Sequence, residues 1–113
     1  MRRASAWAAV TMALMPAVSP AGPWRAVLDL AGGPLPFAIE LSRKGNSWGG
    51  RLCNGTRCQD FSAVRLVGDS LVLEMADYAA TIKARVQGDS LIGSYRNVGN
   101  RGPRVIPFRA GRF

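Results

Sequence analysis

Apolar and polar side chains alternate along most of the chain with a period of two residues. The clearest stretch runs from Tyr78 to Gln87, where apolar residues occupy every even position and polar residues occupy the odd positions from Thr81 onward. This period is typical of a β-strand that buries one face. A sheet with one buried and one solvated face is usually antiparallel, so the pattern predicts an antiparallel, all-β protein.

Turn-forming residues divide the rest of the chain into segments with a similar alternation. Glycine next to aspartate or asparagine recurs between these segments and favours tight hairpin turns. The segment from Asn97 to Pro103 is polar and rich in glycine, and we expect a loop there. The expected strands cover residues 24–30, 37–42, 48–52, 61–67, 71–75, 78–87, 91–95 and 105–108.

About eight short strands joined by hairpins favour an up-and-down meander that closes, or nearly closes, into a small lipocalin-like barrel. A barrel of this size is just wide enough to be filled by its own side chains or to hold one small ligand. Bulky inward residues favour a filled or nearly filled interior, and a true cavity is the alternative. The expected inward residues are Trp24, Leu28, Phe37, Ile39, Trp48, Leu73, Tyr78, Ile82, Tyr95 and Phe108.

Residues 1–21 have the layout of a secretory signal peptide. A basic start precedes an apolar run from Ala6 to Leu14, and small residues follow up to Ala21. The run is shorter than the ~20 apolar residues that a membrane-spanning helix needs, so we expect cleavage after Ala21 and no transmembrane span in the mature chain. The prediction is an exported protein, periplasmic or secreted, with a single β-barrel domain at residues 22–113.

Basic residues outnumber acidic ones, which points to an anionic partner. Fifteen Lys and Arg against seven Asp and Glu give a net charge of +8, which becomes +6 without the two leader arginines. A basic surface attracts anions, and for an exported protein this favours an anionic envelope surface and excludes nucleic acid. A solvated face that serves solubility explains the same excess of basic residues, and it is the interpretation we favour over a binding patch. The candidate patch consists of Arg96, Arg101, Arg104 and Arg109.

The chain contains no histidine, which removes the commonest general base and a common metal ligand. The sequence Gly-Asp-Ser-Leu at 68–71 and 88–91 resembles the motif of a family of serine hydrolases. A serine nucleophile needs a general base, however, and a repeated hairpin unit explains both copies. We therefore expect no catalytic residue, no metal site, no cofactor and no enzymatic activity.

Cys53 and Cys58 flank Asn54-Gly55, which is a strong hairpin signal. In an exported protein such a pair predicts a disulfide. A four-residue loop would set the cysteines directly opposite each other, whereas a two-residue Asn-Gly turn would leave Cys58 diagonal to Cys53. The alternative is a redox-active pair, although catalytic dithiols more often have the spacing Cys-x-x-Cys at a helix N-terminus.

The chain contains Gly22-Pro23-Trp24, Leu35-Pro36-Phe37 and Ile106-Pro107-Phe108 in this order, with further short motifs between them. Taken together, these motifs resemble the β domain that precedes the thioredoxin domain in exported thiol–disulfide reductases and related redoxins. The resemblance implies the accessory domain only, because the family's Cys-x-x-Cys pair lies in the following domain and has no counterpart here. Gly22-Pro23-Trp24 is also similar to the Gly-x-Trp start of lipocalins. The motifs are residues 22–28, 35–41, Trp48, 53–55, 68–71, Tyr78, 91–95 and 106–110.

These observations lead to a function as a non-enzymatic binding or interaction module, related to the accessory domains of thioredoxin-type proteins. Its partner would be an unidentified protein or an anionic envelope surface. Two alternatives stay open. One is a lipocalin-like carrier of a small apolar ligand, and the other is a redox helper that exchanges thiols through Cys53 and Cys58.

Overall fold

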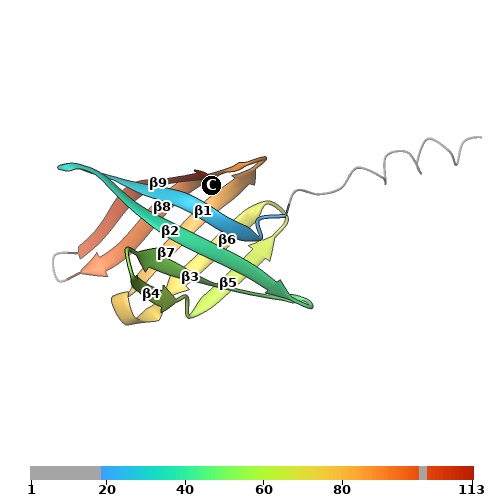
Figure 1. Cartoon of the computed structure of the whole chain (residues 1–113). Helices are drawn as coiled ribbons and strands as arrows, with labels where there is room; N and C mark the ends of the chain where they lie inside the picture. Colours follow the sequence, from blue (N-terminus) through green and yellow to red (C-terminus); the bar gives the residue numbers. More distant parts are fainter. Residues whose placement is uncertain (1–18, 100–101) are drawn as a thin grey trace, which may run out of the picture.

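Nine β-strands and one short 3-10 helix make up residues 19–99 and 102–113, the part of the chain that the computed structural model describes (Figure 1). Most of the expected leader, residues 1–18, and Arg101 lie outside the described residues. Within the described ranges, no helix has the length and apolar character needed to cross a membrane. The elements are β1 (Gly22–Leu30), β2 (Gly33–Lys44), β3 (Ser47–Asn54), β4 (Arg57–Asp60), β5 (Ala63–Val67), β6 (Ser70–Met75), η1 (Ala76–Tyr78), β7 (Ala80–Gln87), β8 (Ser90–Gly99) and β9 (Gly102–Arg112).

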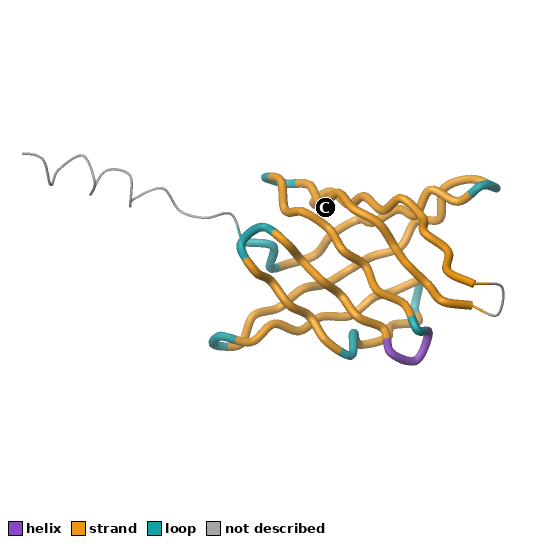
Figure 2. Tube along the Cα trace, turned by 180° about the vertical axis from the view of Figure 1, so that it is seen from behind, coloured by secondary structure: helices purple, strands orange, loops and turns teal. Residues whose placement is uncertain are grey.

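Eight of these strands close into an antiparallel barrel (Figure 2). The wall runs β1–β2–β3–β5–β6–β7–β8–β9 and closes where β9 pairs with β1, with Phe108 opposite Leu28 and Arg112 opposite Trp24. β4 forms a hairpin with β3 and is not part of the ring. The expected up-and-down, lipocalin-like barrel is therefore confirmed.

Several strands are longer than the sequence pattern predicts. β2 has 12 residues, β9 has 11 and β8 has 10. The ladder between β8 and β9 continues through Asn97 opposite Arg104 and Val98 opposite Pro103, so the expectation of a loop from Asn97 to Pro103 is wrong. This end of the hairpin extends beyond the apolar core, where a strand no longer needs apolar side chains, and its composition therefore resembles that of a loop.

Four hairpin turns have the same backbone conformation. Each has a glycine at the first of its two central positions, with φ between 60° and 65°, while the second central residue has no positive φ. This is the arrangement of a type II′ turn, whose twist matches that of the flanking strands. Both Gly-Asp-Ser-Leu segments are turns of this kind followed by a fully buried leucine, so the repeated hairpin is confirmed. The four glycines are Gly45, Gly55, Gly68 and Gly88.

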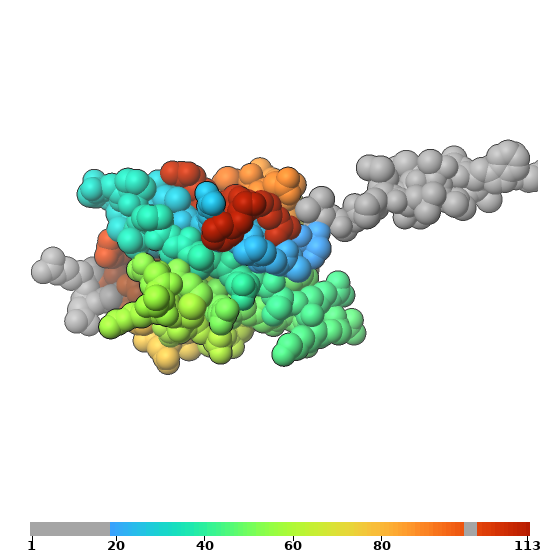
Figure 3. Space-filling model, viewed as in Figure 1, coloured from blue at the N-terminus to red at the C-terminus, as the bar shows by residue number. Residues whose placement is uncertain are grey.

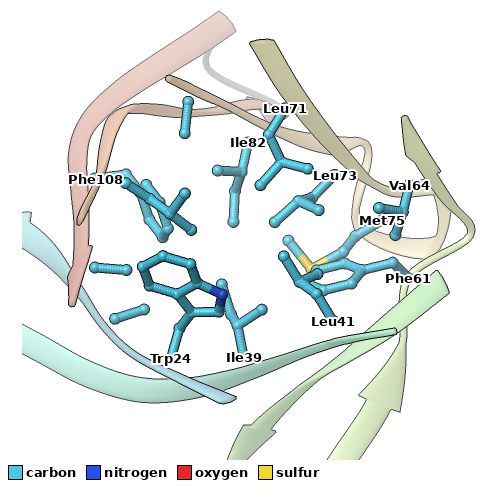
Figure 4. Packing of buried hydrophobic residues seen from close by; sticks show 14 of the residues in the cluster. Trp24, Ile39, Leu41, Phe61, Val64, Leu71, Leu73, Met75, Ile82 and Phe108 are labelled. Carbon is cyan, nitrogen blue, oxygen red and sulfur yellow. The ribbon is translucent and has the colours of Figure 1, made fainter. Parts of the chain in front are cut away.

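The core lies inside the barrel as one cluster of apolar side chains (Figure 4). Small residues make room for its two large buried rings, Trp24 and Phe108. Ala26 pairs with Ala110 across the β1–β9 seam, beside the Leu28–Phe108 pair. Gly93 faces Phe108 from β8, and a Cβ there would lie 1.8 Å from the carbonyl oxygen of Lys83. Large and small side chains thus alternate so that the interior packs without clashes.

Nine of the ten residues expected to point inward are buried in this cluster or packed against it. Tyr78 is the exception, because it belongs to η1 and its side chain is 56% exposed. The chain turns at this point, with Ala79 in the left-handed region at φ 49° before β7 begins. The expectation of Tyr78 as an inward strand residue is therefore wrong. The buried residues are Trp24, Leu28, Ile39, Leu73, Ile82 and Phe108, and the partly buried ones are Phe37, Trp48 and Tyr95.

Candidate functional site

One end of the barrel is closed by side chains. Trp24 lies across the interior with 0% of its surface exposed. Its indole Nε1 donates a hydrogen bond to the carbonyl oxygen of Pro20 at 2.8 Å, and Pro20 is itself fully buried. Leu71 and Leu91, which follow the two repeated turns at this end, are also completely buried. We call this the closed end.

Arg112, the last residue of β9, covers Trp24. Its Cζ atom lies 3.9 Å from the ring centroid, which is a cation–π contact. Its Nη1 and Nη2 atoms donate hydrogen bonds to the carbonyl oxygens of Ala21, at 2.7 Å, and Ser19, at 2.5 Å. Residues 19–21, which the sequence pattern assigns to the leader, therefore contact the barrel directly and belong to its closed end.

The opposite end holds a cavity of about 370 Å³. Four core residues form its deeper part, and they are at most 8% exposed. Apolar side chains from β1, β2 and β3 extend the lining outward to the hairpin turns. The interior is therefore filled by side chains, as expected, at the closed end only. The deeper residues are Leu28, Met75, Ile82 and Ile106, and the outer apolar ones are Leu30, Leu35, Phe37 and Leu52.

Polar side chains complete the lining of this open end. They are Asn54 at the end of β3, Tyr78 in η1, Tyr95 in β8 and Arg104 in β9. The turn that carries Tyr78 is tied to β8, because the Tyr78 carbonyl oxygen accepts a hydrogen bond from Nδ2 of Asn97 at 2.7 Å. The rim therefore presents hydroxyl, amide and guanidinium groups around an apolar interior.

Among the described residues that line the cavity, only Arg104 is charged. It shares the inward side of β9 with Ile106 and Phe108, which are both buried. Across residues 19–99 and 102–113, Arg104 forms no ion pair with a carboxylate. The open end thus combines apolar walls with one positive charge that is not neutralised by a neighbouring side chain.

The structure separates the arginines of the candidate anionic patch. Arg96 is exposed on β8 and lines an outer groove with Lys83, whereas Arg104 lines the cavity. Arg109 is exposed on β9 and forms an ion pair with Asp29, with 3.3 Å between Nε and Oδ2. Arg101 lies outside the described residues. The three described arginines therefore do not form one continuous surface.

Cys53 and Cys58 form the expected disulfide, with 2.05 Å between the sulfur atoms. They lie directly opposite each other on β3 and β4. The central turn residues are Gly55 and Thr56, one position later than an Asn54-Gly55 turn. The hairpin lies at the surface, in green on the face seen in Figure 3, and β4 pairs with the edge of β3 that also pairs with β5. It is not at a helix N-terminus, where catalytic dithiols are usually found.

A larger hollow of about 560 Å³ lies beside β3. Side chains of both charges line it, and two of them, Glu40 and Arg51, form an ion pair at 3.2 Å. Small-molecule sites are lined mainly by apolar and aromatic residues with a few polar groups. The cavity at the open end matches that description better, so we take it as the candidate site.

Sequence reasoning did not single out several residues of this site. Leu52 has no motif around it, Leu35 belongs only to the motif at residues 35–41, and Asn97 lies in the expected loop. Their roles at the cavity depend on strands that are distant in sequence. Arg104 was grouped with the outward arginines. Its even position on β9, two residues before Ile106 and four before Phe108, is the signal that could have placed it on the inward side.

No protein-family model and no curated protein matches the chain. Among solved structures, the barrel is similar to zebrafish ileal bile acid-binding protein in its complex with cholic acid. The TM-score is 0.55 at 10% sequence identity, and the match covers 82% of this chain and 98% of the zebrafish protein. This likeness establishes the barrel fold. The resemblance to redoxin accessory domains, export and the lack of enzymatic activity stay predictions.

Proposed function

We propose that this protein binds a small, largely apolar molecule in the cavity at the open end of the barrel. The observation that carries the proposal is an apolar hollow of about 370 Å³ that is continuous with the core through Leu28, Ile82 and Ile106. Ligand sites of small molecules typically measure about 300–1,000 Å³. Apolar ligand surface that enters this hollow gains about 25 cal/mol for each Å² removed from water.

Hydrogen bonds between neighbouring strands hold the wall around the cavity in place. Hydrogen-bonded ladders join β1 to β2, β2 to β3 and β6 through β9, which together supply most of the lining. A preformed site spends little of its binding free energy on ordering the protein. The zebrafish protein with a similar barrel is named for binding bile acids, which supports a carrier over a purely structural role.

The proposal is tested with N-phenylnaphthylamine, a neutral dye whose fluorescence rises in apolar sites. We expect saturable binding to the wild-type protein. Leu52→Trp should weaken dye binding by about tenfold or more, because the indole would fill part of the hollow and each tenfold loss needs only ~1.4 kcal/mol. Leu52 lies at the partly buried outer lining, so the larger side chain has room to be accommodated without unfolding.

The matched control is Val67→Trp. Val67 is 77% exposed at the end of β5, beside the turn that leads to Leu71 at the closed end. The same indole placed there should leave the affinity for the dye unchanged. Absence of saturable binding by the wild-type protein, or equal affinity in both variants, would exclude the cavity as the binding site.

A further inference from the structure

We propose that the ligand is an amphipathic molecule with one acidic group, and that Arg104 pairs with this group at the rim of the cavity. The inference rests on the proposed function and specifies the chemistry of the ligand. It starts from the composition of the lining. Among the lining residues that the structure describes, the guanidinium of Arg104 is the sole charged group and no carboxylate is present.

The charge of Arg104 is available to a ligand. The other two arginines of β9 have partners: Arg109 pairs with Asp29, and Arg112 bonds to two carbonyl oxygens and lies 3.9 Å from Asp89. Within the described ranges, Arg104 has no such ion pair. A guanidinium matches a carboxylate with two parallel hydrogen bonds, which are stronger than bonds between neutral groups.

The position of Arg104 favours an amphipathic ligand over a small inorganic anion. Arg104 follows the β8–β9 turn, and Ile106, one inward position deeper on the same strand, is 8% exposed in the core. An acidic group at the rim stays in contact with water, so it avoids the large cost of burying a charge. The apolar part of the same molecule then extends past Leu52 and Phe37 toward Ile82.

Neighbouring polar groups fit the same headgroup. The hydroxyls of Tyr78 and Tyr95 and the amide of Asn54 line the cavity together with Arg104. Hydroxyl and amide groups can donate hydrogen bonds to a carboxylate. The described lining of the open end therefore offers an anion several donors beside the cation of Arg104, and none of its described residues is a carboxylate that could bind a ligand cation.

The experiment compares dodecanoate with dodecanol as competitors for bound N-phenylnaphthylamine. The two molecules share their apolar chain and differ in the headgroup. Wild-type protein should bind dodecanoate about tenfold more tightly at low salt, since hydrogen bonds to charged groups are stronger than those between neutral groups and partial exposure at the rim reduces the difference. Arg104→Gln should abolish the preference, because it should weaken dodecanoate binding much more than dodecanol binding.

Arg96→Gln is the control, because it removes the same charge from the outer wall, where Arg96 lines a different groove. It should keep the preference for the acid. A measurement on the wild-type protein alone adds a second criterion: raising the salt concentration should weaken dodecanoate binding more than dodecanol binding, because salt screens exposed charges.

The outcomes separate the two proposals. If the dye itself does not bind, the carrier function fails. If the dye binds but dodecanoate and dodecanol compete equally in the wild-type protein, or Arg104→Gln retains the preference for the acid, the carrier function stands and the pairing with Arg104 is wrong.

Discussion

Both ends of the barrel carry aromatic residues. The aromatic side chain is buried in the packed interior at the closed end, whereas it borders a cavity at the open end. At the closed end, Trp24 is fully buried and its indole nitrogen is bonded to Pro20. At the open end, Tyr78 is 56% exposed and lines a cavity. The strand alternation is similar at both ends. The difference comes from the chain beyond the strands, because residues 19–21 fold over the closed end while turns and η1 border the open one.

Two arginines on β9 show the same contrast. Arg112 stacks on Trp24 and donates hydrogen bonds to the carbonyl oxygens of Ser19 and Ala21, so its guanidinium is bound within the protein itself. Arg104, eight positions earlier, lines the cavity and forms no ion pair within residues 19–99 and 102–113. A polar group that is fully used inside the protein stabilises the fold, whereas one left without a partner beside an apolar hollow is available for binding.

The largest effect on stability is expected from Trp24→Ala. Removing a large aromatic side chain from a packed core costs about 3–5 kcal/mol, because buried surface is lost and a void remains. Phe37→Ala, which removes an aromatic ring from the partly buried lining of the cavity, should cost about half as much, since the hollow already lies beside it. Urea denaturation measures both free energies of unfolding.

Equal losses in these two variants would contradict the distinction between a packed and a hollow end. A loss in affinity for N-phenylnaphthylamine should accompany Phe37→Ala, provided that the protein remains folded at the assay temperature. Trp24→Ala should affect dye binding only through the population of folded protein.

A smaller effect is expected from removing residues 19–21. A chain that begins at Gly22 loses the acceptor of the Trp24 indole and two acceptors of Arg112. We expect it to be less stable than a chain that begins at Ser19 by about 2–3 kcal/mol, in the range for hydrogen bonds to a charged group. Thermal unfolding of the two chains provides the comparison, and identical midpoints would show that these three residues do not support the closed end.

The smallest of these losses, about 2 kcal/mol, is expected for the double variant Cys53→Ser/Cys58→Ser. The disulfide closes a short loop, and the chain-entropy contribution of a disulfide is smaller for a shorter loop. β4 stands outside the ring, so the barrel should persist and dye binding at the open end should be retained. Circular dichroism and dye titration of the variant test both statements, and loss of the β-sheet signal would contradict them.

The same cysteines allow a test of the predicted redox helper. Oxidised protein is incubated in a glutathione redox buffer and its free thiols are counted. Reduction of the disulfide by glutathione would favour thiol exchange, whereas a bond that stays intact indicates a structural link between β3 and β4.

Much of the fold follows from local features of the sequence. Period-two alternation placed Ile82, Leu73 and Phe108 inside the barrel, and glycine-containing turns located the hairpins. Local features also explain the errors. Asn54-Gly55 is a good turn pair, but the register that sets Cys53 opposite Cys58 moves the turn centre to Gly55 and Thr56. Register depends on pairing across the whole sheet, which a short motif does not determine.

The cavity was harder to predict because it depends on where side chains from distant strands do not meet. Seven of the eight ring strands and η1 contribute to its lining, and β5 does not. The volume of a cavity is the small difference between the volume that the barrel encloses and the volume of the side chains that fill it. The amino-acid composition gives only the second of these two volumes. The inward position of Arg104 could have been predicted, because Arg104 lies two residues before Ile106 and alternate residues of a strand share one face.

The seam between β1 and β9 has a consequence for the folding kinetics. It joins the first and last strands of the described chain, and its contacts include Asp29 with Arg109, 80 positions apart. Such contacts must wait until β9 has been synthesised, and closing a long loop carries an entropic cost before any contact repays it. The hairpins from β5 to β8 can form first, while ring closure comes last and sets a folding time on the order of milliseconds to seconds.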